Sequence, residues 1–343
     1  MKPHQNVGRK TARGAAMMAG ASVVGKVIAG RSQIALAFLL FPDEFGLVAL
    51  AFTVIGFTRA IEMLGLREIL VREQGNLDRW INSAMWVGGA MGLVGMACTV
   101  ALAPVASHFF DEPRLWPLIL LLAPSSPMLS LAQICESRLE RDMQFGKLTT
   151  VHIGVITVQS STQVILALFG FGAYSFVLAR TFVCLVRLIY VWGLVRPKVR
   201  WSPQFHRWGS LLKRGLPVAA AAICSTIMDN ADYVILGIVT TKVAVGYYFF
   251  AYMQSMQFVQ IFNNTLSRAR MPGLSTTRDE PERMTHAYLG GIRTLGGIIT
   301  PLCFIQAACS EPLLRALFGA KWEAADPLLQ ILSLSVISFI LFW

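Results

Sequence analysis

The feature that most constrains this chain is a succession of ten apolar stretches, each close to the length of a membrane-spanning helix. A helix of about 20 apolar residues crosses the hydrocarbon core, since each residue rises about 1.5 Å. Hydrophobic residues make up 55% of the chain and charged residues 14%, whereas soluble domains average roughly 45–50% and 25%. We therefore predict an all-α, polytopic membrane protein. The expected spans are about 14–41, 45–66, 81–109, 115–135, 148–168, 174–194, 215–239, one that begins at 247, 288–308 and one that begins near 327.

The formal net charge of +11 is distributed over alternate loops. Basic residues gather in the N-terminus and in the loops near 67–79, 138–147, 196–214 and 268–283. The intervening loops contain only Arg114, Lys242, Arg315 and Lys321. This asymmetry predicts a multi-pass membrane protein with a cytoplasmic N-terminus. Arginines that bind nucleic acid would instead gather with aromatic or polar side chains on one folded face, so no nucleic-acid partner is expected.

The second half of the chain repeats the layout of the first. Arg13-Gly14 opens the first span and Arg214-Gly215 opens the seventh, and Pro117-Leu118 is matched by Pro327-Leu328. Six spans separate the copies, and because this number is even the repeats are parallel.

We therefore expect an N-terminal lobe at residues 1–200 with spans 1–6, and an incomplete C-terminal lobe at 201–343 with spans 7–10. The basic segment 195–212 contains Trp201 and Trp208. It is expected to lie on the cytoplasmic surface at the boundary between the lobes.

Charged residues inside the spans are the candidate functional residues, because a charge at the bilayer centre costs on the order of 2.5–3.5 kcal/mol. Lys26 and Arg31 are five residues apart, about 140° around a helix, so they cannot share one narrow face. One interpretation is that Lys26 and Arg31, together with Arg59, form a cationic patch that binds an anionic headgroup. The other is that they pair with carboxylates such as Asp229 from the second lobe.

The acidic residues also allow two interpretations. Glu62 follows Arg59 at i, i+3, and the two side chains would neutralise each other on the helix surface. Asp229 and Asp232 are also at i, i+3, in the part of span 7 where its apolar run is interrupted. Two close carboxylates in a low dielectric do not both ionise readily, which suits proton or sodium coupling. The alternative is a structural role, with the carboxylates hydrogen-bonding a broken helix. Arg180 and Arg293 lie nearer the span ends and are expected to snorkel.

No pattern in the sequence indicates catalysis, a metal site or a cofactor. The five histidines are scattered, and the six cysteines lie singly without CxxC spacing. A phosphate-binding loop, a dinucleotide fingerprint and a nucleophile elbow are all missing. We therefore expect a protein that is not an enzyme, with no metal and no cofactor apart from a coupling ion.

A set of short motifs, ordered along most of the chain, resembles one family. They are Phe41-Pro42-Asp43-Glu44-Phe45-Gly46, Arg138-Leu139-Glu140-Arg141-Asp142-Met143-Gln144-Phe145, Asn230-Ala231-Asp232, Gly246-Tyr247-Tyr248 with Ala251-Tyr252, Pro272-Gly273-Leu274-Ser275, and Gly319-Ala320-Lys321-Trp322 with Ala325, Leu328 and Leu329. The chain resembles the polysaccharide transporter family of lipid-linked oligosaccharide flippases, of the colanic-acid and O-antigen exporter type. That family belongs to the MOP superfamily, with the MATE drug exporters and the lipid II flippase.

The resemblance implies a two-lobe, V-shaped, parallel-repeat transporter with a central cavity. Such proteins flip an undecaprenyl-pyrophosphate-linked oligosaccharide across the bacterial inner membrane by alternating access, for exopolysaccharide or lipopolysaccharide biosynthesis. On this interpretation Lys26, Arg31 and Arg59 bind the headgroup, and Asp229, Asp232 and Glu62 serve ion coupling or structure. The implied partners are the lipid-linked oligosaccharide, membrane lipids and a polysaccharide polymerase.

Two other functions remain open from the sequence. A MATE-like exporter of cationic drugs would need acidic residues in the cavity of the first lobe, where span 1 offers Lys26 and Arg31. A non-transporting scaffold of the polysaccharide pathway is the second. Members of the resembled family carry 12–14 spans, so we expect the chain to be a fragment or the product of a truncated gene.

Overall fold

The computed structural model describes residues 3–62, 77–197, 205–257 and 281–342, and every structural statement below concerns these ranges. Within them the chain is helical and has no strand. The helices are α1 (Pro3–Leu39), α2 (Pro42–Glu62), α4 (Leu77–Phe109), α5 (Leu115–Leu122), α6 (Ser125–Arg141), α7 (Phe145–Leu168), α8 (Tyr174–Val195), α9 (Phe205–Val239), a helix at 242–257, α11 (Pro281–Ala308), α12 (Ser310–Phe318), the 3-10 helix η1 (Ala320–Ala325) and α13 (Asp326–Phe342).

Six of the described helices are long and apolar enough to cross a membrane. A seventh span results if Gly296–Ala308 and Ser310–Phe318, bent by 74°, are taken as one. Large apolar side chains such as Val23, Phe38 and Ile189 are exposed, as lipid-facing residues must be. The prediction of an all-α, multi-pass membrane protein is confirmed, whereas these helices do not confirm the expected number of ten spans.

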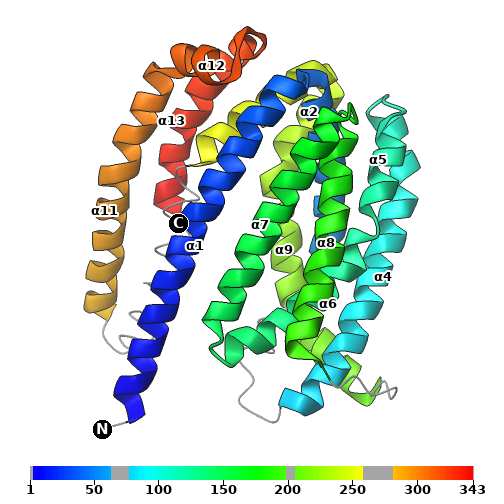
Figure 1. Ribbon diagram of the computed structural model, residues 1–343, viewed down its shortest axis with the longest axis vertical. Helices are drawn as coiled ribbons and strands as arrows, with labels where there is room; N and C mark the ends of the chain where they lie inside the picture. The colour runs from blue at the N-terminus through cyan, green and yellow to red at the C-terminus, as the bar shows by residue number, and fades with distance from the viewer. Residues whose placement is uncertain (1–2, 63–76, 198–204, 258–280, 343) are drawn as a thin grey trace.

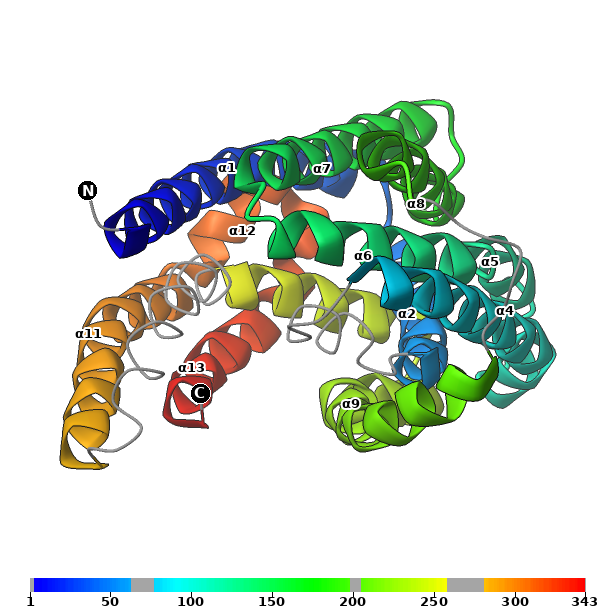
Figure 2. The ribbon, with the colours of Figure 1, turned by 90° about the horizontal axis from the view of Figure 1, so that it is seen from below.

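The helices run along the long axis of the molecule, and α12 lies across one end (Figure 1). The turns that join α1 to α2 and α4 to α5 lie at this same end, and the N-terminus lies at the other. We call the first end the α12 end. Viewed along the helices, α1 lies beside α7, α11 beside α13, and α9 on the opposite side of the bundle from α1 (Figure 2).

The motif after span 1 builds the start of α2. Phe41 precedes the helix and Pro42 takes its first position, where a missing N–H costs nothing. The side chain of Glu44, at the third position, accepts a hydrogen bond from the Phe41 N–H at 3.0 Å, as in a capping box. The helix at 242–257 begins in a similar way, because Thr241 Oγ1 accepts from the Ala244 N–H at 3.4 Å.

These two helix starts meet at the α12 end through a pair of glycines. A Cβ placed on Gly46 would lie 1.9 Å from the carbonyl oxygen of Lys242, and one on Gly246 would lie 1.7 Å from that of Pro42. Both pairs are related by the same offset of 200 residues. The contact is therefore reciprocal, as expected where two parallel repeats meet across a pseudo-two-fold axis.

A buried aromatic cluster lies next to this contact. The Trp322 ring stacks on Phe250 with centroids 3.9 Å apart and meets the edge of Phe45 at 5.0 Å. Phe45 also packs against Phe176 of α8, with centroids 5.3 Å apart. Residues from both halves of the sequence thus form one apolar core at the α12 end.

The 3-10 helix η1, between α12 and α13, caps the end of α1. Lys321 Nζ donates to the carbonyl oxygens of Phe38 and Leu40 at 2.8 and 2.7 Å. Trp322 Nε1 donates to the carbonyl oxygen of Ala37 at 3.0 Å. The last carbonyls of a helix have no partner within the helix, and here the second half of the chain supplies it.

One alternative about the elements is wrong, one expectation is untested and one helix was missed. The alternative of a helix broken at Asp229 and Asp232 is wrong, because α9 is continuous through both residues. Residues 205–212 of the segment expected on the cytoplasmic surface form the first turns of α9; their place at the surface stays a prediction, and residues 198–204 lie outside the described residues. Helix α12 was not predicted at all.

The two prolines of the expected span 115–135 have different effects. Pro124 separates α5 from α6. Pro127, however, lies in the first turn of α6, where a missing N–H breaks no helical hydrogen bond.

Candidate functional site

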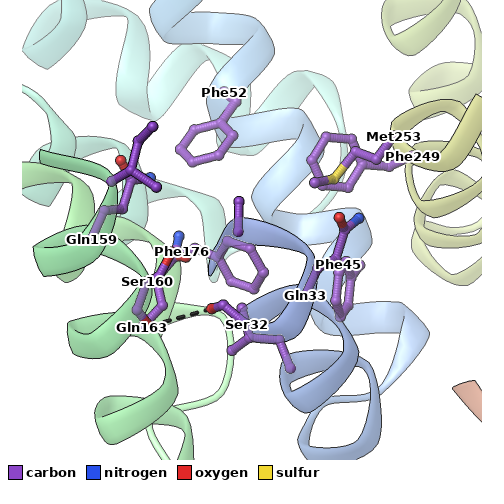
Figure 3. A pocket seen from close by; sticks show the side chains of 13 residues that line it. Ser32, Gln33, Phe45, Phe52, Gln159, Ser160, Gln163, Phe176, Phe249 and Met253 are labelled. Atoms are coloured by element: carbon purple, nitrogen blue, oxygen red, sulfur yellow. Dashed lines mark hydrogen bonds between the residues drawn. The ribbon is translucent and has the colours of Figure 1, made fainter. Parts of the chain in front are cut away.

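The described helices enclose a cavity of about 260 Å³ between α1, α2, α7, α8 and the helix at 242–257 (Figure 3). It draws on both halves of the sequence, and Phe45 and Phe176 of its lining also belong to the aromatic cluster at the α12 end. Its lining residues are Ala29, Ser32, Gln33, Leu36, Phe45, Phe52, Ile156, Gln159, Ser160, Gln163, Phe176, Phe249 and Met253.

The polar part of the lining comes from α1 and α7. Ser32 Oγ donates to the carbonyl oxygen of Ser160 at 3.3 Å and so joins the two helices. The side chains of Gln159 and Gln163 project from successive turns of α7, since residues four apart share a helix face. Gln33 lies across from them on α1 (Figure 3).

Gln33 also begins a chain of amide groups that leads away from the cavity. Its Oε1 accepts from Gln257 Nε2 at 3.2 Å, and Gln257 donates in turn to Gln254 Oε1 at 2.7 Å. Gln306 of α11 donates to the carbonyl oxygen of Gln254 at 3.1 Å. The Nε2 atoms of Gln33 and Gln254 and the Oε1 atom of Gln306 are buried without a hydrogen-bond partner among the described residues. An amide network of this kind retains hydrogen-bonding capacity for a ligand.

The three expected headgroup residues do not line this cavity. Lys26 is half-buried on α1, and it precedes Gln33 by seven residues. That is two helical turns, roughly 10 Å, on the same face. Arg31 is exposed and lies about 140° around the helix from Lys26.

Arg59 of α2 lies in a different part of the structure, among other charges of the first half. The charged side chains close enough to act on it include Arg180 and Arg187 of α8, and Glu62. Arg187 itself makes a double hydrogen bond to Glu136 of α6, at 2.7 and 2.6 Å. The structure thus places Lys26, Arg31 and Arg59 in three different surroundings.

Glu62 is buried at the end of α2. Its carboxylate packs against Gly95 of α4, because a Cβ on that glycine would lie 1.8 Å from Glu62 Oε1. Among the described residues this Oε1 has no hydrogen-bond partner. One turn earlier, Thr99 Oγ1 of α4 donates to Thr58 Oγ1 at 2.9 Å. The first half of the chain therefore contains a buried acidic group with free acceptor capacity.

The two aspartates of α9 differ in their surroundings. Asp232 is half-buried and accepts hydrogen bonds from the Tyr248 hydroxyl at 2.5 Å and from the Tyr233 N–H at 2.9 Å. Asp229 is exposed, and its helix α9 lies on the opposite side of the bundle from α1 (Figure 2). This position argues against the predicted alternative that Asp229 pairs with Lys26 or Arg31.

The sequence interpretation missed the glutamines because it considered only charged residues within the spans. Polar amides in a membrane helix are also costly unless they are paired. Gln159 and Gln163 bound a polar run, Gln159-Ser160-Ser161-Thr162-Gln163, inside an apolar span, and this run would have indicated a polar helix face. The described residues contain no group of three or more His, Cys, Asp or Glu side chains suited to a metal.

Comparison with known proteins agrees with this architecture. A family described as polysaccharide biosynthesis protein matches residues 35–327. The succinoglycan biosynthesis transport protein ExoT of Rhizobium meliloti (strain 1021) is 27% identical over 305 residues, which are 88% of this chain and 61% of ExoT. The lipopolysaccharide biosynthesis protein WzxC of Escherichia coli (strain K12) is 20% identical over 327 residues, 94% of this chain and 66% of WzxC. The chain therefore spans about three fifths to two thirds of the length of these relatives.

Two solved structures show the fold. The lipid II flippase MurJ in an inward closed conformation superposes with a TM-score of 0.77 at 13% identity, covering 95% of this chain and 73% of MurJ. An inward-facing multidrug resistance MATE transporter of the MOP superfamily gives a TM-score of 0.59 at 15% identity, covering 95% and 77%. The protein thus has the two-lobe fold of the MOP transporters, and it belongs to the polysaccharide biosynthesis protein family.

Proposed function

We propose that this protein is a flippase that moves a lipid-linked oligosaccharide across the bacterial inner membrane for exopolysaccharide or lipopolysaccharide biosynthesis. The observation that carries the proposal is a cavity with serine and glutamine side chains in its lining, formed by both halves of an otherwise apolar helix bundle. The family match and the names of ExoT and WzxC supply the substrate class. The lipid carrier we assign is undecaprenyl pyrophosphate.

The geometry suits alternating access with the α12 end outward and the N-terminus in the cytoplasm. At the α12 end the halves are joined by the glycine contact, the contact of Phe45 with Trp322 in the aromatic cluster and the ion pair of Lys242 with Glu112 at 2.7 Å. Substrate would enter from the opposite end and leave when this closure parts. A pyrophosphate is too polar to cross the membrane unaided, and lysine and arginine contacts would replace its hydration. Lys26, Arg31 and Arg59 are the residues proposed for this role.

Ion coupling is a separate part of the proposal. Asp232, held by Tyr248, and Glu62, whose Oε1 has no hydrogen-bond partner among the described residues, are the best-placed groups, with exposed Asp229 as a third. A proton or a sodium ion bound there would link transport to an ion gradient. No other cofactor is proposed. A polysaccharide polymerase that receives the flipped unit is a proposed partner.

The lining argues against a MATE-like exporter of cationic drugs. Its 13 residues include no acidic side chain, and a cationic ligand would need one to offset its desolvation. A non-transporting scaffold would have no use for a cavity lined by serine and glutamine side chains between its helices. Family and fold both indicate a transporter rather than an enzyme.

Complementation tests the function. The complete gene and the 343-residue chain would be expressed in a bacterium that lacks its own exopolysaccharide flippase, and surface polymer would be measured. We expect the wild type to restore polymer and the triple variant Lys26→Gln, Arg31→Gln, Arg59→Gln to abolish it while still inserting into the membrane. Arg293→Gln, an exposed arginine of α11, is the matched control and should leave export unchanged.

The outcomes separate the parts of the proposal. Unchanged export in the triple variant would contradict the cationic headgroup site. The flippase function would be contradicted if the wild-type protein inserted stably but restored no polymer in a strain that makes the succinoglycan repeat unit of its relative ExoT.

A further inference from the structure

The cavity between α1 and α7 has the chemistry of a carbohydrate site rather than of a phosphate site. Five of its 13 lining residues are serine or glutamine, four are phenylalanine, and none is charged. A sugar ring presents hydroxyls at its edge, which donate and accept hydrogen bonds as amides do. It also presents C–H groups on its faces, which pack on aromatic rings. A pyrophosphate would instead require cationic side chains.

The hydrogen-bonding capacity of the cavity is only partly used. Gln33 Nε2 is buried without a partner among the described residues, although Gln33 Oε1 is held by Gln257 at 3.2 Å. Leaving such a donor unpaired is costly, and a hydroxyl acceptor would remove that cost. Gln159 and Gln163 approach the same space from α7 (Figure 3).

The aromatic residues complete the site on other sides. Phe52 and Phe45 come from α2, Phe176 from α8 and Phe249 from the helix at 242–257. Their rings lie around the space between the polar side chains of α1 and those of α7 (Figure 3). The volume of 260 Å³ equals that of roughly nine liquid waters, at about 30 Å³ each. This is the size class of a single sugar ring.

The position of the cavity along α1 agrees with this assignment. Lys26 lies two turns, roughly 10 Å, further from the α12 end on the same face as Gln33. A lipid-linked sugar that enters from the N-terminal end with its sugar leading would place a ring in the cavity while its pyrophosphate lies near Lys26.

We infer that the cavity of Gln33, Gln159, Gln163 and the four phenylalanines is a subsite for one neutral sugar ring of the lipid-linked unit, separate from the cationic site for its pyrophosphate. The inference rests on the proposed flippase function. It also predicts that specificity for the sugar resides in uncharged residues of both halves of the chain.

A binding experiment tests the subsite with two probes. The purified protein, reconstituted in lipid nanodiscs, would be titrated with polyprenyl pyrophosphate and with polyprenyl pyrophosphate that carries one hexose, and binding would be followed by tryptophan fluorescence. Each lost neutral hydrogen bond weakens binding roughly fivefold. We expect Gln33→Leu with Gln163→Leu to weaken binding of the hexose-carrying lipid at least that much and to leave the bare carrier within about twofold. Gln133→Leu on α6, outside the lining, is the matched control.

A second variant guards against a folding defect. Phe52→Leu keeps an apolar side chain but removes an aromatic face, so it should weaken only the hexose-carrying lipid, by roughly threefold. Size-exclusion profiles would confirm that each variant is folded. Free hexose should bind more weakly than the lipid-linked sugar, and equal binding would overturn the assignment to a lipid-linked unit.

Different results would contradict the flippase function and the sugar subsite. If wild type binds neither lipid, the flippase function fails. If wild type binds both lipids and the folded variants change neither affinity, or both equally, the sugar subsite is wrong while the flippase function stands.

Discussion

At the scale of single residues, Trp322 shows how a short motif acquires its meaning only in three dimensions. Gly319-Ala320-Lys321-Trp322 is readable in the sequence, but its partners Ala37, Phe38 and Leu40 lie some 280 residues earlier. No periodicity or spacing connects them. Local motifs such as Phe41-Pro42-Asp43-Glu44 are different, because the capping bond of Glu44 spans three residues and follows from helix geometry.

The burial of Trp322 gives a prediction about stability. Its side chain is fully buried and stacked on Phe250, so Trp322→Ala should destabilise the fold by about 3–5 kcal/mol. Trp322→Phe keeps most of the packing but leaves the carbonyl of Ala37 without its donor, and should cost about 1–3 kcal/mol. Thermal melting in detergent would measure both. Trp116→Ala on α5, where the side chain is 52% exposed, is the control, and a loss as large as that of Trp322→Ala would contradict the role of burial.

At the scale of elements, the sequence predicted the order of the helices and their parallel repetition. It could do so because apolar runs and loop charges are local signals. One of its two alternatives for Asp229 and Asp232, a broken helix, is wrong, because α9 is continuous through both residues. The sequence interpretation missed α12, a helix of nine residues too short for a search based on spans, and it missed the glutamine-lined cavity, whose residues meet only when α1, α7 and the helix at 242–257 pack together.

The reciprocal glycine contact predicts that two helix starts tolerate no side chain. A methyl on Gly46 or on Gly246 would overlap backbone atoms of the other repeat, and backbone cannot move aside as a flexible side chain does. We expect Gly46→Ala and Gly246→Ala each to lower stability by about 1–3 kcal/mol. Gly154→Ala on α7, where nothing lies within 4 Å, should be neutral or stabilising, because alanine favours helix. Melting curves of the three variants measure these changes in stability. Equal melting temperatures would mean that the repeats do not touch at Gly46 and Gly246.

At the scale of the whole molecule, the glycine contact, the contact of Phe45 with Trp322 and the ion pair of Lys242 with Glu112 join segments from the two halves of the chain at the α12 end. Transport by alternating access requires these contacts to break and re-form together, so none of them should be too strong. The ion pair of Lys242 and Glu112 is the most readily tested, because its side chains are 34% and 13% exposed and a partly buried charge that loses its partner is penalised.

Reversal of the charge at Lys242 alone should open the α12 end. Lys242→Glu places a like charge against Glu112, and the resulting repulsion in a partly buried site favours separation of the halves. Ser32→Cys, introduced into a cysteine-free background, reports access to the cavity through its reaction with a membrane-impermeant thiol reagent added outside. We expect slow labelling with the native pair, labelling several-fold faster with Lys242→Glu, and slow labelling again when Glu112→Lys is added.

Arg315→Glu breaks an exposed ion pair with Glu323 inside the second half and should leave labelling unchanged. Fast labelling with the native pair would mean that the α12 end is open at rest, and unchanged labelling in Lys242→Glu would mean that other contacts hold it shut.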